Sequence, residues 1–361
     1  MADIVKVGSF CPNPDCPKHG QTEGNEIIRH GWTKQDKQRF RCKCCGQSFN
    51  ENRGTLFYRK RTPEKDITEA LAMLADGSGV NSVSRVKGVS ADTVVAWQRE
   101  AGTLAEAVSD ALLGDHEAGP SQVDGLWSFV VHKGSKKNLP ETPVEGTFWR
   151  TTVLETATRL RVAQGLGKSE TEASEQAFRQ LQGRGNPDAP PPLISDGWGG
   201  IDQALIEVCG HVPVYSGRGR PPTLKRPGEG WLYVMIIKHR DSTGNLVSVE
   251  HKVVLGDETL ALATLGHSTA YVERTHLTMR IHGARLIRKG LQFSKDVLLH
   301  RAAAAWDDLV HNVARPLKTL RQRLADEAKR RWWPRTPAMA AGLTDRIWSI
   351  GDILRAVPAP V

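Results

Sequence analysis

Apolar residues recur at helical spacing in the first third of the chain. In "EKDITEALAMLADG" the positions of Ile67, Leu71 and Leu74 predict a helix. "VNSVSRVKG" predicts a short second helix, Gly88 a turn, and Ser90 the N-cap of a third helix over "ADTVVAWQREAG". Helix, short helix, glycine turn and capped helix are the layout of a helix-turn-helix, and a plain three-helix bundle is the alternative.

Beyond Pro120 the pattern changes to strands. "SQVDGLWSFVV" is typical of a mostly buried strand, and "TFWRTTVLETATRLRVAQGLG" predicts a β-hairpin that turns at "TATR". An amphipathic helix over "TEASEQAFRQLQG" follows, then a strand in "PPLISDGWGG". "HSTAYVERTHLTMR" opens a long helix. This mixture of strands and helices predicts an α/β domain.

Three carboxylates stand at defined places in this order of elements. Asp124 lies inside the first strand, Asp196 ends a later strand, and Glu273 lies near the start of the long helix. A carboxylate in a buried strand is costly unless it is paired or bound to a cation. The order predicts a ribonuclease-H-like α/β fold with a mixed sheet, which brings the three carboxylates to one edge. For Asp196 the alternative is a helix cap, because Asp before a helix is common.

Three oxygen donors suit Mg²⁺ or Mn²⁺ rather than a softer metal. Two such ions can activate a water or a 3′-hydroxyl and stabilise the leaving oxygen of a phosphodiester. Arg280 follows Glu273 by seven residues and therefore shares its helix face, where a cation can hold a DNA phosphate. Arg274 and Arg285 are further candidates, for which a solvated surface position is the alternative.

Two cysteine pairs near the N-terminus have the spacing of zinc knuckles: Cys11, Cys16, Cys42 and Cys45. Four thiolates predict a closed, structural Zn²⁺ site, and a small segment of this kind takes its folding energy from the metal. Incidental reduced cysteines are the alternative. Cys44 competes with Cys45 as a ligand and His19 with Cys16; the two-residue knuckle spacing favours Cys45.

Charge indicates a polyanionic partner. The net charge is +9 and the isoelectric point about 9.3. Residues 1–60 hold 11 Lys/Arg against 6 Asp/Glu, and residues 274–335 hold 15 against 5. Two basic regions favour a nucleic-acid binder. The residues expected to meet DNA are Arg39 and Arg41 beside the second knuckle, Ser90, Asp92, Thr93 and Gln98 on the third helix, and Arg218, Arg220, Arg274, Arg285 and Lys295.

The chain shows neither an apolar signal segment nor a run of about 18 apolar residues. We therefore expect no membrane partner and a cytoplasmic, nucleoid-associated protein.

The motifs together resemble a known family. "CPNPDCPKHG…RFRCKCCGQSF", "VDGLWSFV", "ISDGWGG" and "AYVERTHLTMR…LIRKGLQFSK" are similar to transposases of the insertion sequence 1 family, which carry an Asp-Asp-Glu triad and a basic residue seven positions later. The resemblance implies cleavage at transposon ends and strand transfer with a divalent metal. It makes Asp124, Asp196 and Glu273 the triad and Arg280 the basic partner, and it places Ser294 and Lys295 on the DNA-facing side.

The sequence departs from compact members of that family between Asp196 and Glu273, which indicates an insertion over about 212–266. It contains "RGRP", similar to an AT-hook core, for which a flexible basic loop is the alternative. It also contains a hairpin turning at 242–245, and Asp257 and Glu258 are rival acids, expected in a loop. The expected domains are a zinc ribbon (1–58), a helix-turn-helix (59–102), a linker (103–120), the catalytic domain (121–325) and a C-terminal tail helix (326–361). That apolar tail packs either on its own domain or on a partner subunit.

Three functions compete. The first is an active transposase, assembled as a dimer or larger on double-stranded DNA because two element ends must be held together. The second is a catalytically retired transposase that acts as a repressor, and the third is a nuclease on the same fold. The complete triad with Arg280 favours an enzyme over a repressor. The N-terminal DNA-reading module favours a transposase over a nuclease.

Overall fold

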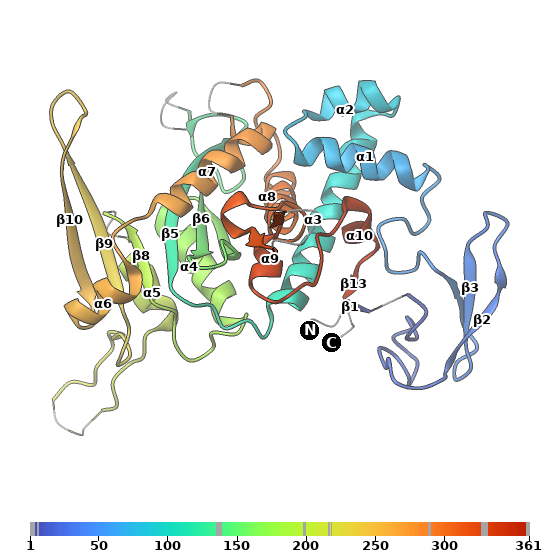
Figure 1. The fold of residues 1–361 in the computed structure, drawn as a ribbon, viewed down its shortest axis with the longest axis horizontal. Helices are drawn as coiled ribbons and strands as arrows, with labels where there is room; N and C mark the ends of the chain where they lie inside the picture. Colours follow the sequence, from blue (N-terminus) through green and yellow to red (C-terminus); the bar gives the residue numbers. More distant parts are fainter. Residues whose placement is uncertain are drawn as a thin grey trace.

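A mixed sheet of six strands forms the centre of the computed structural model (Figure 1). The structure describes residues 4–5, 7–134, 139–197, 200–215, 217, 219–287, 290–325 and 331–358. The strand order is β10-β9-β8-β5-β6-β7. The strands are β5 (Ser121–Val130), β6 (Gly146–Glu155), β7 (Arg161–Gly167), β8 (Leu193–Asp196), β9 (Tyr233–Arg240) and β10 (Leu246–Leu255).

Strand direction divides the sheet into two parts. β5, β6 and β7 are successive antiparallel neighbours, and β8 and β9 run parallel to β5. β10 returns antiparallel to β9. The predicted hairpin of β6 and β7 is therefore confirmed, and the chain is a mixed α/β protein.

Helices cover both faces of the sheet. α4 (Glu170–Gln182) packs against β6 and β7, and α5 (Ile201–Cys209) packs beside it. A Cβ on Gly165 of β7 would lie 2.7 Å from the backbone nitrogen of Ala177, so glycine permits this close packing. α7 (Ala270–His282) contacts β5 from the other face, as the side-chain contacts below show. α6 (Glu258–Leu265), α8 (Val297–Ala314) and the 3₁₀ helices η2 (Ala284–Leu286) and η3 (Lys318–Leu320) complete this region.

Three helices precede the sheet at the predicted places: α1 (Glu64–Ala75), α2 (Val80–Lys87) and α3 (Ala91–Leu113). Gly88 ends α2 with a left-handed φ of 65°. Ser90 caps α3, because its hydroxyl accepts a hydrogen bond from the Thr93 N–H at 3.1 Å.

The prediction of a linker over 103–120 is wrong for residues 103–113, which continue α3 and carry buried residues such as Ala105 and Val108.

The long α3 joins the helical region to the sheet region. It packs along α8 so closely that a Cβ on Gly102 would lie 2.7 Å from the carbonyl oxygen of Ala302. Val94 and Trp97 of α3 and Trp306 of α8 belong to one continuous apolar core. The two regions therefore share a core, because an amphipathic helix as long as α3 must bury its apolar stripe along its whole length.

A buried ion network ties α8 to the sheet. Arg150 of β6 pairs with Asp308 at 2.6 Å, and Arg161 of β7 pairs with Asp307 at 2.6 Å and Asp308 at 2.9 Å. Arg315 pairs with Asp307 at 2.9 Å. Burial raises the pKa of Asp307, but the three guanidinium groups outweigh it and hold that pKa below its usual range. Removing one partner would leave a buried charge uncompensated.

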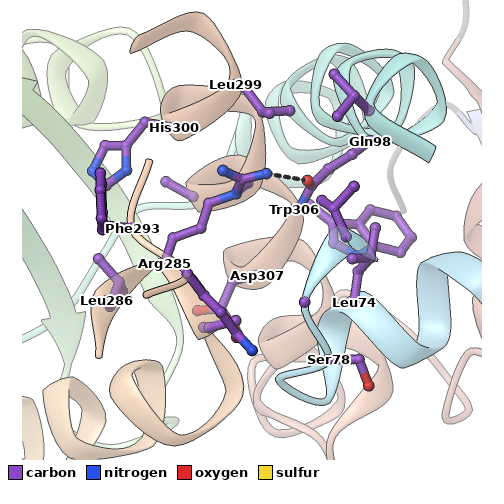
Figure 2. Close-up of a pocket in the computed structure, with 18 of the residues that line it drawn as sticks. Leu74, Ser78, Gln98, Arg285, Leu286, Phe293, Leu299, His300, Trp306 and Asp307 are labelled. Carbon is purple, nitrogen blue, oxygen red and sulfur yellow. Dashed lines mark hydrogen bonds between the residues drawn. The ribbon is translucent and has the colours of Figure 1, made fainter. Parts of the chain in front are cut away.

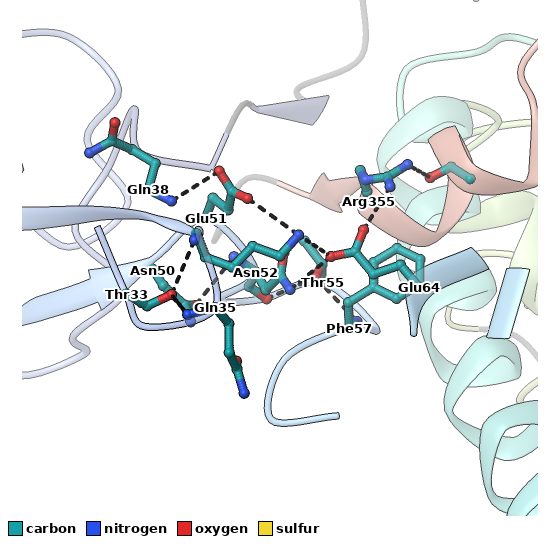
Figure 3. A network of polar contacts seen from close by, with 12 residues as sticks. Thr33, Gln35, Gln38, Asn50, Glu51, Asn52, Thr55, Phe57, Glu64 and Arg355 are labelled. Atoms are coloured by element: carbon teal, nitrogen blue, oxygen red, sulfur yellow. Dashed lines mark hydrogen bonds and ion pairs between the residues drawn. The ribbon is translucent and has the colours of Figure 1, made fainter. Parts of the chain in front are cut away.

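The N-terminal region is a small antiparallel sheet of β2 (Ile27–Trp32), β3 (Gln38–Cys42) and β4 (Ser48–Asn50). Glu64 at the start of α1 bonds to Lys37 at 2.6 Å, Asn52 at 3.1 Å and Arg355 at 2.7 Å (Figure 3). This one carboxylate therefore connects the N-terminal sheet, α1 and the C-terminal segment.

The C-terminal segment packs on its own chain. It forms β11 (Gln322–Arg323), β12 (Trp332–Trp333), α9 (Pro337–Ala340), α10 (Ile350–Arg355) and β13 (Val357–Pro358) rather than a single tail helix. β13 pairs with β1 (Ile4–Val5), which brings the first and last described strands together (Figure 1). Ile353 and Leu354 are buried in the main core. Of the two alternatives for the tail, the structure shows packing on its own chain.

The region expected as an insertion is only partly peripheral. β9 is an integral strand beside β8, and β10 extends the sheet with largely exposed residues. The hairpin turns near Asp241–Asn245, as predicted. Asp257 caps α6 by accepting from the Leu260 N–H at 2.9 Å, so the rival acids lie at a helix start and not in a loop. No helix in the described ranges has the length and apolarity needed to cross a bilayer.

Candidate metal and nucleic-acid sites

The four predicted cysteines form one cluster. The sulfur atoms of Cys11, Cys16, Cys42 and Cys45 all lie within 4.8 Å of one another. The Cys11–Cys45 sulfur separation is 3.7 Å and the Cys16–Cys42 separation is 3.9 Å. Tetrahedral Zn²⁺ with Zn–S bonds of about 2.3 Å requires sulfur separations of roughly 3.8 Å. The cluster is therefore compatible with a closed, structural zinc site.

The structure also decides the two competing ligands. Cys44 is exposed and outside the cluster, and His19 uses its Nδ1 on the Cys11 carbonyl at 3.0 Å. The backbone N–H of Gln47 donates to Cys45 and lowers the pKa of that thiol to about 6, whereas burial raises the pKa of Cys11. The buried thiol therefore needs a cation to be held as thiolate.

Asp124 and Asp196 come together through strand register. Val123 of β5 is paired with Ser195 of β8 in parallel register, so the next residues, Asp124 and Asp196, are neighbours on the same face. Adjacent strands lie about 4.8 Å apart. Two carboxylates at that spacing repel one another unless a cation or a proton lies between them. The register therefore sets these two strand positions side by side.

Glu273 reaches the same region from α7. The start of α7 is fixed to β5 because the Val272 N–H donates to the Gln122 side chain at 2.9 Å. Glu273 accepts a hydrogen bond from Thr269 at 2.8 Å and forms an ion pair with Lys238 at the end of β9. We call Asp124, Asp196 and Glu273 the acidic site.

Two side chains that the sequence did not single out act as partners of the acidic site. Lys238 holds Glu273, and His276, one turn after Glu273, places Nδ1 3.1 Å from the Asp124 carboxylate. His276 is buried at 5% exposure. The Glu273/His276 spacing of three residues on one helix face was the available signal. Lys238 had none, because its reach depends on β9 joining the sheet.

The acidic site is not closed in the way the cysteine cluster is. Within the described ranges, only the four cysteines bring three or more ligand atoms within 4.8 Å. The donors of the acidic site are all carboxylate oxygens, the set that Mg²⁺ and Mn²⁺ prefer. Glu170, a fourth carboxylate that the sequence did not single out, lies against β5 at 7% exposure. Burial, with added repulsion from Asp196 and Asp124, raises the pKa of Glu170 to about 7.

The helix-cap alternative for Asp196 concerns the start of α5. That helix begins after Gly200, and its N-cap residue is therefore a glycine that offers no side-chain capping bond. The neighbouring Ser195 bonds instead to the Tyr233 hydroxyl at 2.7 Å.

The basic residues of α7 lie near the acidic site. Arg274 is exposed next to Glu273, and Arg280 is half-buried two turns along the same helix. Lys295 is exposed, but Ser294 is fully buried and bonds to His300 Nδ1 at 2.7 Å. The expectation that Ser294 faces DNA is therefore wrong.

The third helix is split between solvent and interior. Ser90 and Asp92 are exposed and Thr93 is half-buried, as a DNA-reading surface requires. Gln98 is buried at 5% exposure and accepts a hydrogen bond from Arg285 at 3.1 Å (Figure 2). We expected Gln98 and Arg285 to contact DNA, but both lie in the wall of a cavity of about 430 Å³ between α1–α3 and α8. Burial there lowers the pKa of Arg285.

The remaining candidate DNA contacts lie at the periphery. Arg39 is half-buried and Arg41 exposed on β3, and their alternate positions place them on one face of that strand. Arg220 is exposed in the loop between α5 and β9, and Arg218 lies outside the described residues.

No protein-family model matches this chain, and no curated protein matches it at a significant level.

Proposed function

We propose that this protein is a DNA transposase that binds the ends of a mobile element, cleaves phosphodiester bonds and transfers the 3′-hydroxyl ends to target DNA. The observation that carries the proposal is the register of β5 and β8, which sets Asp124 beside Asp196 under the helix that bears Glu273.

The strand order supports the fold that this function needs. In chain order the five strands β5 to β9 are arranged 3-2-1-4-5, with the first three antiparallel and the last two parallel to the first. That arrangement is ribonuclease-H-like, with β10 as an added edge strand. In such a sheet the carboxylates of the first and fourth strands lie side by side. The fold and the acidic residues thus favour the same chemistry.

In this proposal the residues of the acidic site and of α7 have distinct roles. Asp124, Asp196 and Glu273 would hold two divalent cations, which supply a Lewis acid at the phosphodiester and a low pKa for the attacking hydroxyl. Arg274 and Arg280 add positive charge along α7 for the DNA backbone. His276 fixes the orientation of Asp124 through its 3.1 Å contact.

The N-terminal region supplies DNA recognition in this proposal. Ser90, Asp92 and Thr93 at the start of α3 are placed as the reading end of a helix-turn-helix. The zinc ribbon adds Arg39 and Arg41. Because α3 shares a core with the catalytic sheet, the reading helix and the acidic site keep one geometry relative to each other. This shared core favours a sequence-reading transposase over a nuclease that reads only shape.

The test uses a supercoiled plasmid that carries the element's own ends, the zinc-loaded protein and Mg²⁺. We expect nicks at the end boundaries followed by joined products. Asp196→Asn should reduce nicking at least about 100-fold while end binding persists, because a metal ligand is lost and the fold is not. Asp188→Asn, an exposed acid before β8, is the matched control.

Each outcome separates the competing functions. End binding without nicking in either Mg²⁺ or Mn²⁺ would support the repressor, and nicks without joined products would support the nuclease. Equal nicking by the Asp196→Asn and wild-type proteins would refute the assigned role of the acidic site.

A further inference from the structure

Glu170 is a buried carboxylate to which the fold gives no obvious structural partner. It is the first residue of α4 and is 7% exposed. Within the described ranges it makes neither a hydrogen bond nor an ion pair. A buried carboxylate without a partner costs several kcal/mol, which is a large fraction of the stability of a domain.

The position of Glu170 at a helix N-terminus offsets little of the free-energy cost of burying its carboxylate. An acid in the first turn of a helix gains about 0.3–1 kcal/mol from the helix dipole. Glu172 occupies the same turn and already supplies that charge from an exposed position, where it also bonds to the Lys168 N–H at 2.7 Å. The burial of Glu170 is therefore not explained by helix capping.

The sequence of β5 makes room for this side chain. A Cβ on Gly125 would lie 2.7 Å from Glu170 Cδ, so any side chain at position 125 would displace the carboxylate. Gly125 directly follows Asp124, whose Oδ1 accepts from the Gly125 N–H at 2.7 Å. The glycine thus lets the Glu170 carboxylate reach the β5 backbone directly beside Asp124.

We propose that Glu170 is a fourth carboxylate of the acidic site and binds, with Asp124 and Asp196, the divalent cation held there. This inference rests on the proposed function for the existence of the cation, and it adds the ligand that the triad lacks. The repulsion from Asp196 and Asp124 described above agrees with this placement. A cation between the three groups would remove that repulsion and draw their oxygens together.

The proposal makes stability and metal binding respond in opposite directions. Glu170→Gln keeps the shape of the side chain and removes the buried charge. We therefore expect an unfolding temperature that is unchanged or higher, together with Mn²⁺ affinity weakened about tenfold or more. A residue that only packs would show the reverse pattern, with lower stability and unchanged metal affinity.

The experiment titrates Mn²⁺ into the zinc-loaded full-length protein and follows free Mn²⁺ by electron paramagnetic resonance, with thermal unfolding measured on the same samples. Glu175→Gln is the matched control, since Glu175 lies on the same helix and only pairs with Arg179 at the surface. Asp196→Asn serves as the reference for a lost ligand. No DNA and no activity are needed for either measurement.

The outcomes distinguish this inference from the proposed function. If Asp196→Asn weakens Mn²⁺ binding and Glu170→Gln does not, the fourth ligand is refuted and the triad stands. If the wild-type and Asp196→Asn proteins bind Mn²⁺ equally weakly, both proposals fail. Weakened binding in Glu170→Gln, with stability kept and Glu175→Gln unchanged, is the expected result.

Discussion

The cysteine cluster and the acidic site are two groups of metal-ligand residue types assembled in different ways. The four sulfur atoms already lie at tetrahedral separations, within 4.8 Å of one another. The carboxylates of the acidic site are neighbours through β5, β8 and α7, yet Lys238 and His276 hold two of them individually. One site is closed and the other is held open.

The difference agrees with what a metal would do at each site in the proposed function. A structural zinc site supplies the folding energy of a segment that has almost no core of its own, so its ligands must close completely. A catalytic site must admit substrate, and its scaffold folds from buried apolar strands without help from a metal. Local sequence therefore builds the first site, and tertiary structure builds the second.

The strongest way to test this comparison is to remove one cysteine. Cys42 is fully buried in the cluster, and Cys42→Ser should release zinc and unfold the N-terminal sheet, because structural zinc contributes about 10–16 kcal/mol. Zinc release to a chromogenic chelator and amide hydrogen exchange over residues 7–58 measure this.

Cys44→Ser is the matched control, since Cys44 is exposed and outside the cluster. It should keep both zinc and protection from exchange. Zinc loss from the two variants alike would refute the ligand set derived from the sulfur positions.

Acid provides a second, smaller test, because the sheet region depends on buried histidines rather than on thiolates. Burial, with the charges of Arg150 and Arg285, lowers the pKa of His300 to about 3. Unfolded histidine titrates near 6.5, so between pH 6.5 and 3 the unfolded state binds more protons. Stability from His300 is thus present above pH 6.5 and is lost as the pH falls, by about 2 kcal/mol at pH 5.

Denaturant unfolding at pH 7 and pH 5 measures this loss. His300→Gln should reduce the difference between the two pH values by about 2 kcal/mol. His30→Gln, at an exposed position on β2, should leave it unchanged. An unaltered pH dependence in His300→Gln would assign the acid sensitivity to other groups, among them the buried His311, whose pKa burial also lowers.

The smallest expected effect concerns Lys238. Its ammonium group neutralises Glu273 and competes with any cation there. Lys238→Met should therefore strengthen Mn²⁺ binding, by only about two- to fivefold because both partners are partly exposed to water. Lys252→Met removes the same charge from the exposed β10 and should have no effect. Weaker Mn²⁺ binding in Lys238→Met would mean that the lysine organises the acidic site instead of competing for it.

The sequence predicted local features well wherever spacing alone sets geometry. Two cysteine knuckles, the Ser90 cap and the hairpin turn near 242–245 each depend on a few neighbouring residues, and each is confirmed. The sequence-based prediction failed where the helix was assigned correctly but the surroundings of its side chains were not. Gln98 and Arg285 are residue types that commonly contact DNA, yet both line the wall of a cavity between α3 and α8.

Glu170, His276 and Lys238 were beyond prediction for the same reason. A glutamate at a helix start, a histidine on a helix and a lysine at a strand end are ordinary surface residues in a sequence. Only the approach of α4 to Gly125 brings Glu170 against β5. The approach of α7 to β5 and of β9 to β8 gives His276 and Lys238 their carboxylate partners.

The sequence by itself determined most helices and strands up to Ala314 and the four cysteines of the cluster, because these depend on periodicity and short spacing. Tertiary structure alone decided the continuity of α3 with the core, the packing of the C-terminal segment on β1 and α1, and which side chains meet the acids. These contacts join residues that lie from 35 positions apart, for Lys238 and Glu273, to more than 300, for Ile4 and Pro358. Their partners are chosen by burial of apolar surface across the whole chain, which no local pattern records.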